Sequence, residues 1–347
     1  MISGKKVRLQ AIGFECKLEL ESCEFASTLD GAQVLVAIEA IGVCHRDLID
    51  RSGRIPFMTI PITLGHEACG RVIAVGPAVK DWKIGDRVAT LHRDACGQCA
   101  ACQAGETTLC GLATWALGLL ADGTYATHLV APESCLYAMS DEVPAPEAAV
   151  MHCTVGTALR GMRAANLQAG ERVLITGASG GVGSAAVQVA TRLGAEVIAQ
   201  VRSDVHVERL RALGAKAVVV DDGRSFHKRS EGQSIDVVLE CVGESCFNSS
   251  LRSLRLGGRL VLIGNIVPTR VELNLGLVIV KAIHIIGSSG ANRSNMAEAL
   301  ALDRVSPLRP PIERLLDLAS AEEAQQLVKK GGLLGRVVLQ PGTTDPI

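Results

Sequence analysis

Residues 173–183 read VLITGASGGVG, and this stretch decides the fold. Its first four residues have the pattern of a buried strand, and they run directly into a glycine-rich turn. Gly180 and Gly181 let the backbone approach a pyrophosphate, while Gly183 lets the following helix pack closely on the sheet. The N-terminus of that helix supplies free N–H groups and a positive dipole end. Ala178 takes the place of the first glycine in the strict pattern, with Gly177 beside it.

Alternating strands and helices extend on the C-terminal side of this turn. Strands are predicted at 196–201 and 217–220, separated by a helix that ends near Gly214, and these complete a βαβαβ unit. Further strands are predicted at 237–240 and 259–263, and the apolar run 278–287 is predicted to be a last, edge-like strand. The pattern predicts a doubly wound parallel sheet, so the glycine turn indicates a dinucleotide site. The expected coenzyme contacts in the turn are Gly177, Ser179, Gly180, Gly181, Val182 and Gly183.

The end of the second strand of this unit indicates which dinucleotide is bound. An acidic residue about 20 positions after the glycines holds the ribose of NAD, whereas an arginine accommodates the 2′-phosphate of NADP. Here Val201 is followed by Arg202 and Ser203, and Asp204 can cap the next helix. We therefore favour NADPH, with NADH as the other possibility, and expect Arg202 and Ser203 to contact the coenzyme.

Two cysteines and one histidine in the chain have the composition of an open metal site. Cys44, His66 and Cys153 give zinc three ligands and leave one position free, as in a catalytic rather than a structural site. The alternative for any one of them alone is a buried core residue. The trio is favoured because it occurs together with the dinucleotide turn and a second cysteine set.

Four closely spaced cysteines form that second set. Cys96, Cys99, Cys102 and Cys110 can surround one zinc ion with no open position, so we expect a structural zinc site. Disulfides are one alternative, but cysteines three apart in a chain of intracellular type favour metal. A nucleic-acid-binding zinc module is the other. It would carry a basic, aromatic helix, whereas the residues between these cysteines are neutral or acidic.

Length and composition limit the function further. A chain of 347 residues is long enough for about two domains. The net charge of −1 and the 3% aromatic content give no basis for binding nucleic acid or a membrane surface. No apolar signal segment or membrane-spanning run is found, and we expect a cytoplasmic protein.

Short strand patterns punctuated by glycine and proline dominate the first part of the chain. Examples lie at 34–40, 68–75, 87–91 and 127–131. We expect a β-barrel-like domain over 1–153 that carries both zinc sites, and a dinucleotide-binding domain over 154–290. Residues 291–347 contain a predicted helix at 321–330 and a strand at 336–339, and this segment is expected to return to the first domain.

These motifs together resemble the zinc-containing medium-chain dehydrogenase/reductase superfamily, and the resemblance covers essentially the whole chain. It rests on the metal and nucleotide motifs above and on Gly85-Asp86-Arg87-Val88. It implies an α/β protein, with a Rossmann doubly wound parallel sheet plus a GroES-like β-barrel catalytic domain and the active site between them. It also implies a soluble homodimer or homotetramer.

The same resemblance implies roles for individual residues. Asp47 resembles the carboxylate that orients His66, and Glu67 resembles the acid beside the metal. Thr157 resembles the hydroxyl near the nicotinamide, and Arg336 a cation near the pyrophosphate. The remaining coenzyme contacts implied in this way are His45, Gly264 and Asn265.

The chain departs from the alcohol dehydrogenases of this family at two positions. There, a Ser or Thr two residues after the first zinc cysteine takes the alcohol proton, and a His three residues further on often passes it to solvent. Here Arg46 and Ile49 occupy these positions, and neither relays a proton at neutral pH. Cys44-His45-Arg46-Asp47 instead resembles acryloyl-CoA reductase-like members.

The sequence therefore predicts an NAD(P)H-dependent zinc reductase that acts on the C=C bond of a short α,β-unsaturated acyl-CoA, of the acryloyl-CoA or dimethylacrylyl-CoA type. The alternatives are a zinc-dependent alcohol dehydrogenase or aldehyde reductase, and a non-catalytic protein on the same fold. His92 or zinc-bound water would donate the proton to the α-carbon. By charge alone, Arg46, Arg51 and Arg54 are candidates to contact the CoA phosphates.

Overall fold

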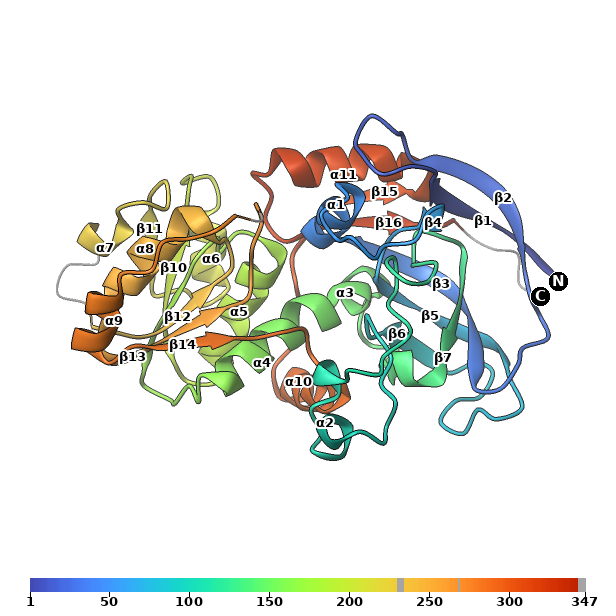
Figure 1. Cartoon of the computed structure of the whole chain (residues 1–347), viewed down its shortest axis with the longest axis horizontal. Coiled ribbons are helices and arrows are strands. Elements are labelled where there is room, and N and C mark those ends of the chain that lie inside the picture. The colour runs from blue at the N-terminus through green and yellow to red at the C-terminus, as the bar shows by residue number, and fades with distance from the viewer. Residues whose placement is uncertain (230–233, 268, 343–347) are drawn as a thin grey trace.

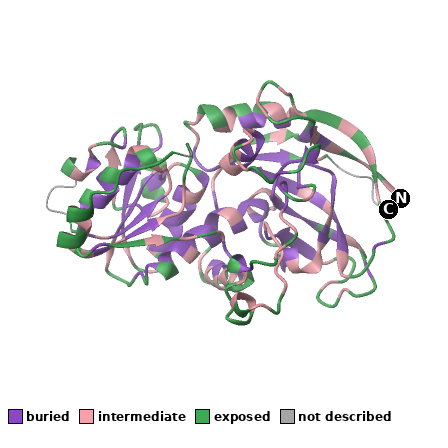
Figure 2. Cartoon of the chain, viewed as in Figure 1, coloured by how far each residue is buried: buried purple, intermediate pink, exposed green. Residues whose placement is uncertain are grey.

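The computed structural model describes residues 1–229, 234–267 and 269–342 of the chain, and it divides into two lobes. In Figure 1 a parallel sheet flanked by helices lies at one end and antiparallel strands lie at the other, with helices α3 and α4 between them. Buried residues follow the strands of both lobes (Figure 2), so each lobe has its own core. This is the α/β architecture that the sequence predicted.

The parallel sheet is the predicted doubly wound sheet. Its strand order is β11-β10-β9-β12-β13-β14, and all of its neighbours are parallel. The order reverses between β9 and β12, and ligands of such sheets bind outside the carboxyl ends of the strands at this point. The strands are β9 (Arg172–Ile175), β10 (Glu196–Val201), β11 (Ala217–Val220), β12 (Ile235–Glu240), β13 (Leu254–Leu262) and β14 (His284–Gly287). The helices of this lobe are α5 (Gly181–Arg192), α6 (Val207–Ala212), α7 (Phe226–Arg229), α8 (Glu244–Ser253) and α9 (Leu275–Lys281).

The other lobe is built on a seven-stranded sheet of order β15-β16-β3-β5-β6-β8, with β7 paired to β3. Its strands from the first part of the chain are β3 (Gln33–Val43), β5 (Glu67–Val75), β6 (Arg87–Thr90), β7 (His128–Pro132) and β8 (Leu136–Ala138). A smaller sheet of order β2-β1-β4 is formed by β1 (Ile2–Leu9), β2 (Glu19–Phe25) and β4 (Ile62–Thr63). The short helical segments of this lobe are α1 (His45–Arg51), α2 (Ala100–Gln103), η1 (Thr107–Leu109) and η2 (Glu133–Cys135).

The C-terminal segment returns to the lobe that is built on the seven-stranded sheet, as expected. Strand β16 (Arg336–Gln340) pairs antiparallel with β3 and parallel with β15 (Ile312–Asp317). In the chain α10 (Arg293–Val305) precedes β15, and η4 (Leu318–Ser320) and α11 (Ala321–Lys330) lie between β15 and β16. The proposed domain limits at 153/154 and 290/291 remain predictions, and residues 343–347 lie outside the described part of the chain.

One predicted element was wrong. The run 278–287 is not a single strand, because α9 occupies Leu275–Lys281 and only His284–Gly287 forms β14. The Asn274 side chain accepts a hydrogen bond from the Leu277 N–H and caps the helix. Ala282 then turns the chain with a φ of 49°. A continuous apolar run carries no period that separates helix from strand, so these two local features decide the outcome.

A helical segment joins the lobes, and its middle turn is a π-helix rather than an α-helix. It consists of α3 (Ala145–Val150), a π-helical turn at His152–Gly156 and α4 (Thr157–Ala164). Such π turns inside helices occur often at functional sites, and this one contains Cys153. Within the described residues, none of the helices has both the length and the apolar character needed to span a membrane.

Candidate active site

The three predicted ligands of the open metal site come together at the junction of the lobes. Cys44 follows β3 and precedes α1, His66 precedes β5, and Cys153 comes from the π-helical turn. The Cys44 and Cys153 sulfurs lie 3.8 Å apart. One ligand atom from each of these residues and from Glu67 lies within 4.8 Å of the others, so the group is compact enough to hold one metal ion.

The imidazole of His66 is oriented for metal binding. Its Nδ1 lies 2.9 Å from Asp47 Oδ1, whereas its buried Nε2 has no hydrogen-bond partner in the described part of the chain. The buried Asp47 carboxylate also accepts hydrogen bonds from the Cys44 N–H and the Tyr125 hydroxyl, each at 2.9 Å. A carboxylate behind the ring fixes the tautomer that offers Nε2 to a metal.

Electrostatics at this site also favour a bound cation. Burial opposes protonation of His66, but the Asp47 carboxylate outweighs it and raises the pKa of the ring to about 10. The same negative charge stabilises a metal ion at Nε2. The pKa of the Cys44 thiol lies well below its ordinary value, because Cys44 accepts a hydrogen bond from Cys153 and lies near the Arg336 guanidinium. A thiolate is the form of cysteine that binds metal.

Arg336 connects the metal ligands to the glycine turn. Its NH2 group lies 3.0 Å from Glu67 Oε1 and within 3.5 Å of the Cys44 and Cys153 sulfurs. The Gly335 N–H donates to Ser179 O at 2.8 Å, which brings this segment against the turn. A side chain at Gly181 would overlap the guanidinium. The predicted cation near the pyrophosphate therefore lies between the glycine turn and the metal ligands, where it forms an ion pair with Glu67.

Glu67 is buried completely beside the metal ligands. Desolvation raises the pKa of its carboxyl group to about 7, although the Arg336 guanidinium opposes the shift. The carboxylate fits here only because Gly42 has no side chain that would overlap it. Glu67 thus lies beside the predicted ligands Cys44, His66 and Cys153.

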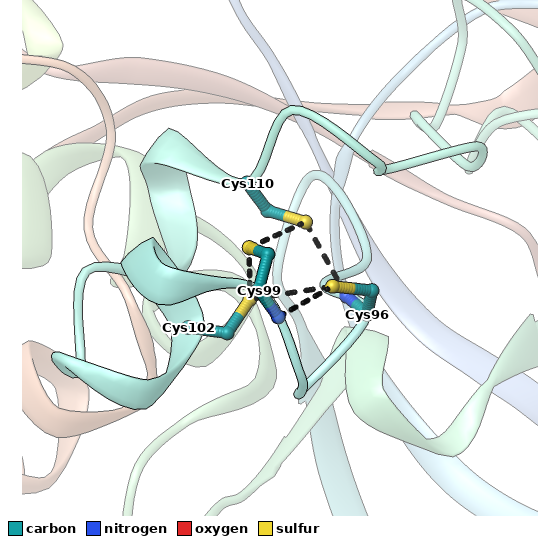
Figure 3. Close-up of side chains that lie close together, drawn as sticks. All are labelled: Cys96, Cys99, Cys102 and Cys110. Atoms are coloured by element: carbon teal, nitrogen blue, oxygen red, sulfur yellow. Dashed lines mark hydrogen bonds between the residues drawn. The ribbon is translucent and has the colours of Figure 1, made fainter.

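The four remaining predicted ligands form a separate cluster (Figure 3). The Cys99 sulfur lies 3.5 Å from that of Cys102 and 3.9 Å from that of Cys110, and the sulfurs of Cys96 and Cys102 are 3.9 Å apart. Zinc–sulfur bonds of about 2.3 Å in a tetrahedron place sulfurs about 3.8 Å apart, whereas a disulfide requires about 2 Å. All twelve cysteines of the chain are free. The cluster therefore fits one closed zinc site and no disulfide.

The segment that carries this cluster, residues 94–112 or the cysteine lobe, contacts its surroundings through polar side chains. Arg93 donates to the carbonyl oxygens of Thr108 and Cys110, and it follows His92, which lines the cleft. Arg160 on α4 forms an ion pair with Glu106 at 2.5 Å. A metal ion bound by these four cysteines would thus stabilise a segment that contacts both halves of the protein.

A cleft of about 1370 Å³ runs from the glycine turn to the open metal site. Gly177 adopts a φ of 56°, and a side chain at Gly183 would overlap the backbone at 177–178, so both glycines are required by the tight turn. Of the predicted coenzyme residues, all of the following line this cleft: His45, Thr157, Gly177, Ser179, Gly180, Gly181, Val182, Gly183, Arg202, Ser203, Gly264, Asn265 and Arg336.

Two of these residues have specific surroundings. The His45 ring nitrogen Nε2 lies 3.1 Å from Ile266 O, so a side chain of α1 reaches the loop after β13. Thr157 is buried, and its hydroxyl lies 3.5 Å from His152 O. At the end of β10, Arg202 and Ser203 are exposed, and no carboxylate occupies this position.

The substrate end of the cleft combines apolar and cationic side chains. Arg46 and His92 line it. Burial, followed by the positive charge of neighbouring groups, holds the pKa of His92 well below its ordinary value, so its ring is neutral near pH 7. A neutral imidazole can relay a proton from another group, whereas only the protonated imidazolium form could supply a proton of its own. The apolar lining consists of Ile49, Phe57, Trp115, Ala116, Leu119 and Leu120.

The expected phosphate contact of Arg51 was wrong. Its side chain is fully buried and donates to the carbonyl oxygens of Gly13 and Cys16 and to Gln325 Oε1. It also forms an ion pair with Glu322 at 2.9 Å. Arg51 therefore fastens α1 to α11 and is not available to a ligand. Arg54 is exposed, and it has a polar or charged interaction of its own.

Sequence reasoning missed two residues that shape the site. Tyr125 donates to Asp47 across 78 positions of sequence, and Trp115 lines the substrate end from a loop. Neither belongs to a spaced motif, so only the tertiary structure reveals them.

Comparison with known proteins agrees with this geometry. Residues 30–141 match the alcohol dehydrogenase GroES-like domain, and residues 181–305 match the zinc-binding dehydrogenase family. The chain is 35% identical to acryloyl-coenzyme A reductase of Metallosphaera sedula over 88% of this chain and 92% of that protein. It is 33% identical to an alcohol dehydrogenase of Geobacillus stearothermophilus, with coverage of 89% and 92%.

Solved structures show the same relationship. The crystal structure of AibC is 39% identical, with a TM-score of 0.91 and coverage of 98% of this chain and 96% of that one. A thermostable alcohol dehydrogenase from Pyrobaculum aerophilum, with cobalt and zinc bound, is 28% identical, with a TM-score of 0.89 over 98% and 100% of the two chains. The chain therefore belongs to the zinc-containing medium-chain dehydrogenase/reductase superfamily. It is an NAD(P)-dependent oxidoreductase with a GroES-like domain and a Rossmann domain.

Proposed function

We propose that this oxidoreductase reduces the C=C bond of a short α,β-unsaturated acyl-CoA with NAD(P)H. The observation that carries the proposal is the pair Arg46 and Ile49, which line the cleft where a hydroxyl and an imidazole would serve an alcohol dehydrogenase. The similarity to acryloyl-coenzyme A reductases of Metallosphaera sedula and Sulfurisphaera tokodaii, 35% and 33% identical, supports the same class of substrate. The acyl group is proposed to be acryloyl or branched dimethylacrylyl.

In the proposed reaction, a reduced nicotinamide coenzyme held at the glycine turn would supply a hydride, which forms a bond to the β-carbon. The π electrons of the C=C bond move toward the thioester carbonyl, and its oxygen gains negative charge. A proton then adds to the α-carbon, so that enoyl-CoA, NAD(P)H and one proton give acyl-CoA and NAD(P)⁺. No hydroxyl proton is removed, so the reaction does not need the relay that the chain lacks.

We propose Cys44, His66 and Cys153 as ligands of a catalytic zinc, with one position open, and Cys96, Cys99, Cys102 and Cys110 as ligands of a structural zinc. The orphaned Nε2 of His66 and the sulfur spacings support this assignment. Zinc in the open site would supply a Lewis acid for the substrate oxygen. The residues of this chain orient that metal through Asp47 and exclude water with the apolar lining of the cleft.

We favour NADPH over NADH as the coenzyme. Arg202 and Ser203 are exposed in the cleft directly after β10, where a carboxylate would be expected in an NAD-dependent enzyme. A guanidinium pairs with a 2′-phosphate through charge-assisted hydrogen bonds.

The assembly is proposed to be a homodimer or homotetramer. Strand β14 is at the edge of the parallel sheet, with β13 as its neighbour, and no strand among the described residues pairs with its outer edge, which a second copy could therefore extend. The helix α9 that precedes it leaves Leu275, Ile279 and Val280 at least 64% exposed. A second copy would cover this apolar surface.

Activity with a substrate panel tests the proposed function. We expect rapid oxidation of NADPH with acryloyl-CoA, crotonyl-CoA or dimethylacrylyl-CoA, and slow turnover of simple aldehydes and alcohols, because a missing acid–base relay lowers rates by roughly 10²–10⁴. The measurement is the decrease in absorbance at the nicotinamide wavelength with each substrate. Efficient turnover of primary or secondary alcohols together with no turnover of any enoyl-CoA would establish the alcohol dehydrogenase alternative.

Replacement of Arg202 by alanine tests the coenzyme. We expect the KM for NADPH to rise about 10- to 100-fold while that for NADH is unchanged, since a hydrogen bond to a charged group contributes about 1.5–3 kcal/mol. Arg211→Ala, which removes an exposed arginine that pairs with Glu208 on α6, is the matched control. A wild-type kcat/KM that is higher for NADH than for NADPH would contradict the assignment.

A further inference from the structure

Helix α1 contains an ion pair with a buried carboxylate, close to the metal ligand Cys44. Asp50 is only 1% exposed, and its Oδ2 lies 3.1 Å from Arg46 Nε, four residues earlier in the helix. The second oxygen, Oδ1, is buried and has no hydrogen-bond partner among the described residues. The Asp50 carboxylate thus has one close partner in the described structure, the side chain of Arg46.

Burial of this carboxylate is unfavourable by itself. Desolvation raises the pKa of Asp50 to about 6, although the Arg46 guanidinium opposes the shift. A buried ion pair contributes little net stability, and a well-packed neutral pair is often at least as stable. The energy of the pair therefore does not account for its presence, which points instead to the geometry that it imposes on Arg46.

In that geometry the two terminal NH2 groups of Arg46 do not contact Asp50. The contact with Asp50 involves Nε, and neither terminal NH2 group forms a hydrogen bond with any residue that the structure describes. The side chain is 26% exposed and lines the cleft. A guanidinium fork of this kind is a strong donor to an oxygen that carries negative charge.

The position of Arg46 in the cleft indicates which part of a substrate it meets. It lies two residues from Cys44, and its charge acts on His66 and His92 at the metal end of the cleft. The phosphates of an acyl-CoA are at the far end of the pantetheine arm from the thioester. The group nearest to Arg46 is therefore the acyl end of the substrate rather than its phosphates.

We propose that Arg46 binds the thioester oxygen of the substrate and that Asp50 is the positioning residue that holds the fork toward it. This inference rests on the proposed function. As hydride reaches the β-carbon, the oxygen gains negative charge, and a hydrogen bond from the fork becomes stronger than in the ground state. A carbonyl oxygen has two lone pairs, so this bond leaves one for a metal ion at Cys44, His66 and Cys153.

A double-mutant cycle between the two residues tests this role. Arg46→Gln should lower kcat for crotonyl-CoA about 10²-fold, as loss of one oxyanion donor does. Asp50→Asn should lower kcat about tenfold, with KM for NADPH unchanged and with no decrease in Tm, because it removes a buried charge and keeps the shape. In the Arg46→Gln background, Asp50→Asn should change kcat less than about twofold, since it acts through Arg46.

Two further variants separate positioning from a structural role. Arg46→Lys should not restore kcat, because an ammonium has no Nε–H for Asp50 together with a free fork. The control is Asp303→Asn. It removes a buried carboxylate of α10 that pairs with Arg309 at 2.6 Å, and it should leave kcat unchanged. An unchanged kcat in Asp50→Asn, or an equal effect with and without Arg46, would overturn this inference alone. A wild-type enzyme that reduces no enoyl-CoA would refute the proposed function, and this inference with it.

Discussion

Replacement of Cys153 by alanine is expected to abolish activity and to leave the fold intact. Cys153 supplies one of three ligands to the open site, and a Lewis-acid contribution of several kcal/mol corresponds to a rate loss on the order of 10³ or more. The π-helical turn that contains Cys153 is held by backbone hydrogen bonds that do not involve the sulfur, including Gly156 N–H to Met151 O at 2.9 Å. The measurements are kcat with crotonyl-CoA, zinc per chain and Tm.

Zinc content should fall from two to one per chain in this variant. Cys135→Ala is the control, because Cys135 is a buried cysteine of the same lobe that lies outside both cysteine sets. It should retain two zinc ions and wild-type kcat. Full activity of Cys153→Ala with one zinc lost, or two zinc ions retained, would show that Cys153 is not a ligand of a catalytic metal.

Replacement of Cys99 by alanine is expected to have the larger effect on stability. The sulfur of Cys99 lies within 3.9 Å of those of Cys102 and Cys110, so its loss opens a closed site. Structural zinc in small zinc-binding peptides contributes roughly 10–16 kcal/mol to folding, and loss of the metal should unfold the cysteine lobe locally. We expect one zinc per chain, a lower Tm and proteolytic cleavage between residues 94 and 112.

The control for this experiment is Cys16→Ala, which removes a partly exposed cysteine outside both clusters. That variant should keep two zinc ions and resist the protease as the wild type does. Two zinc ions in Cys99→Ala, or an uncut lobe, would contradict the structural assignment. Because the lobe contacts α4 through Arg160 and Glu106, activity should also decline, but through loss of the lobe and not of the open site.

Much of the Rossmann lobe could be predicted from local signals. Its strands are short, apolar and followed by glycine or a helix, so the ranges 196–201 and 217–220 coincide with β10 and β11. The two cysteine-containing clusters were also predictable as groups, and the structure brings the residues of each together, whereas their role as metal ligands stays a prediction. The run 278–287 was wrongly predicted to be one strand, because its division into the end of α9 and β14 depends on the Asn274 cap and the left-handed Ala282.

The burial and the partners of charged side chains were harder to predict from the sequence. Arg51 was expected at a ligand, yet its partners Gly13, Cys16 and Gln325 lie 35 to 274 positions away and bury it completely. The orientation of Arg46 likewise depends on how deeply α1 buries Asp50. A sequence shows that these charges exist, but burial and long-range partners decide which of them face a ligand.

The transfer of a labelled hydride tests the central claim most directly. Wild-type enzyme would be incubated with crotonyl-CoA and NADPH that carries deuterium at C4 on the transferred face, and the acyl-CoA product analysed by mass spectrometry and NMR. The proposed function predicts butyryl-CoA with one deuterium on the β-carbon and a solvent-derived proton on the α-carbon. Unlabelled, unreduced crotonyl-CoA in this incubation, together with deuterium at C1 of the alcohol formed when an aldehyde is added in a second incubation, would contradict it.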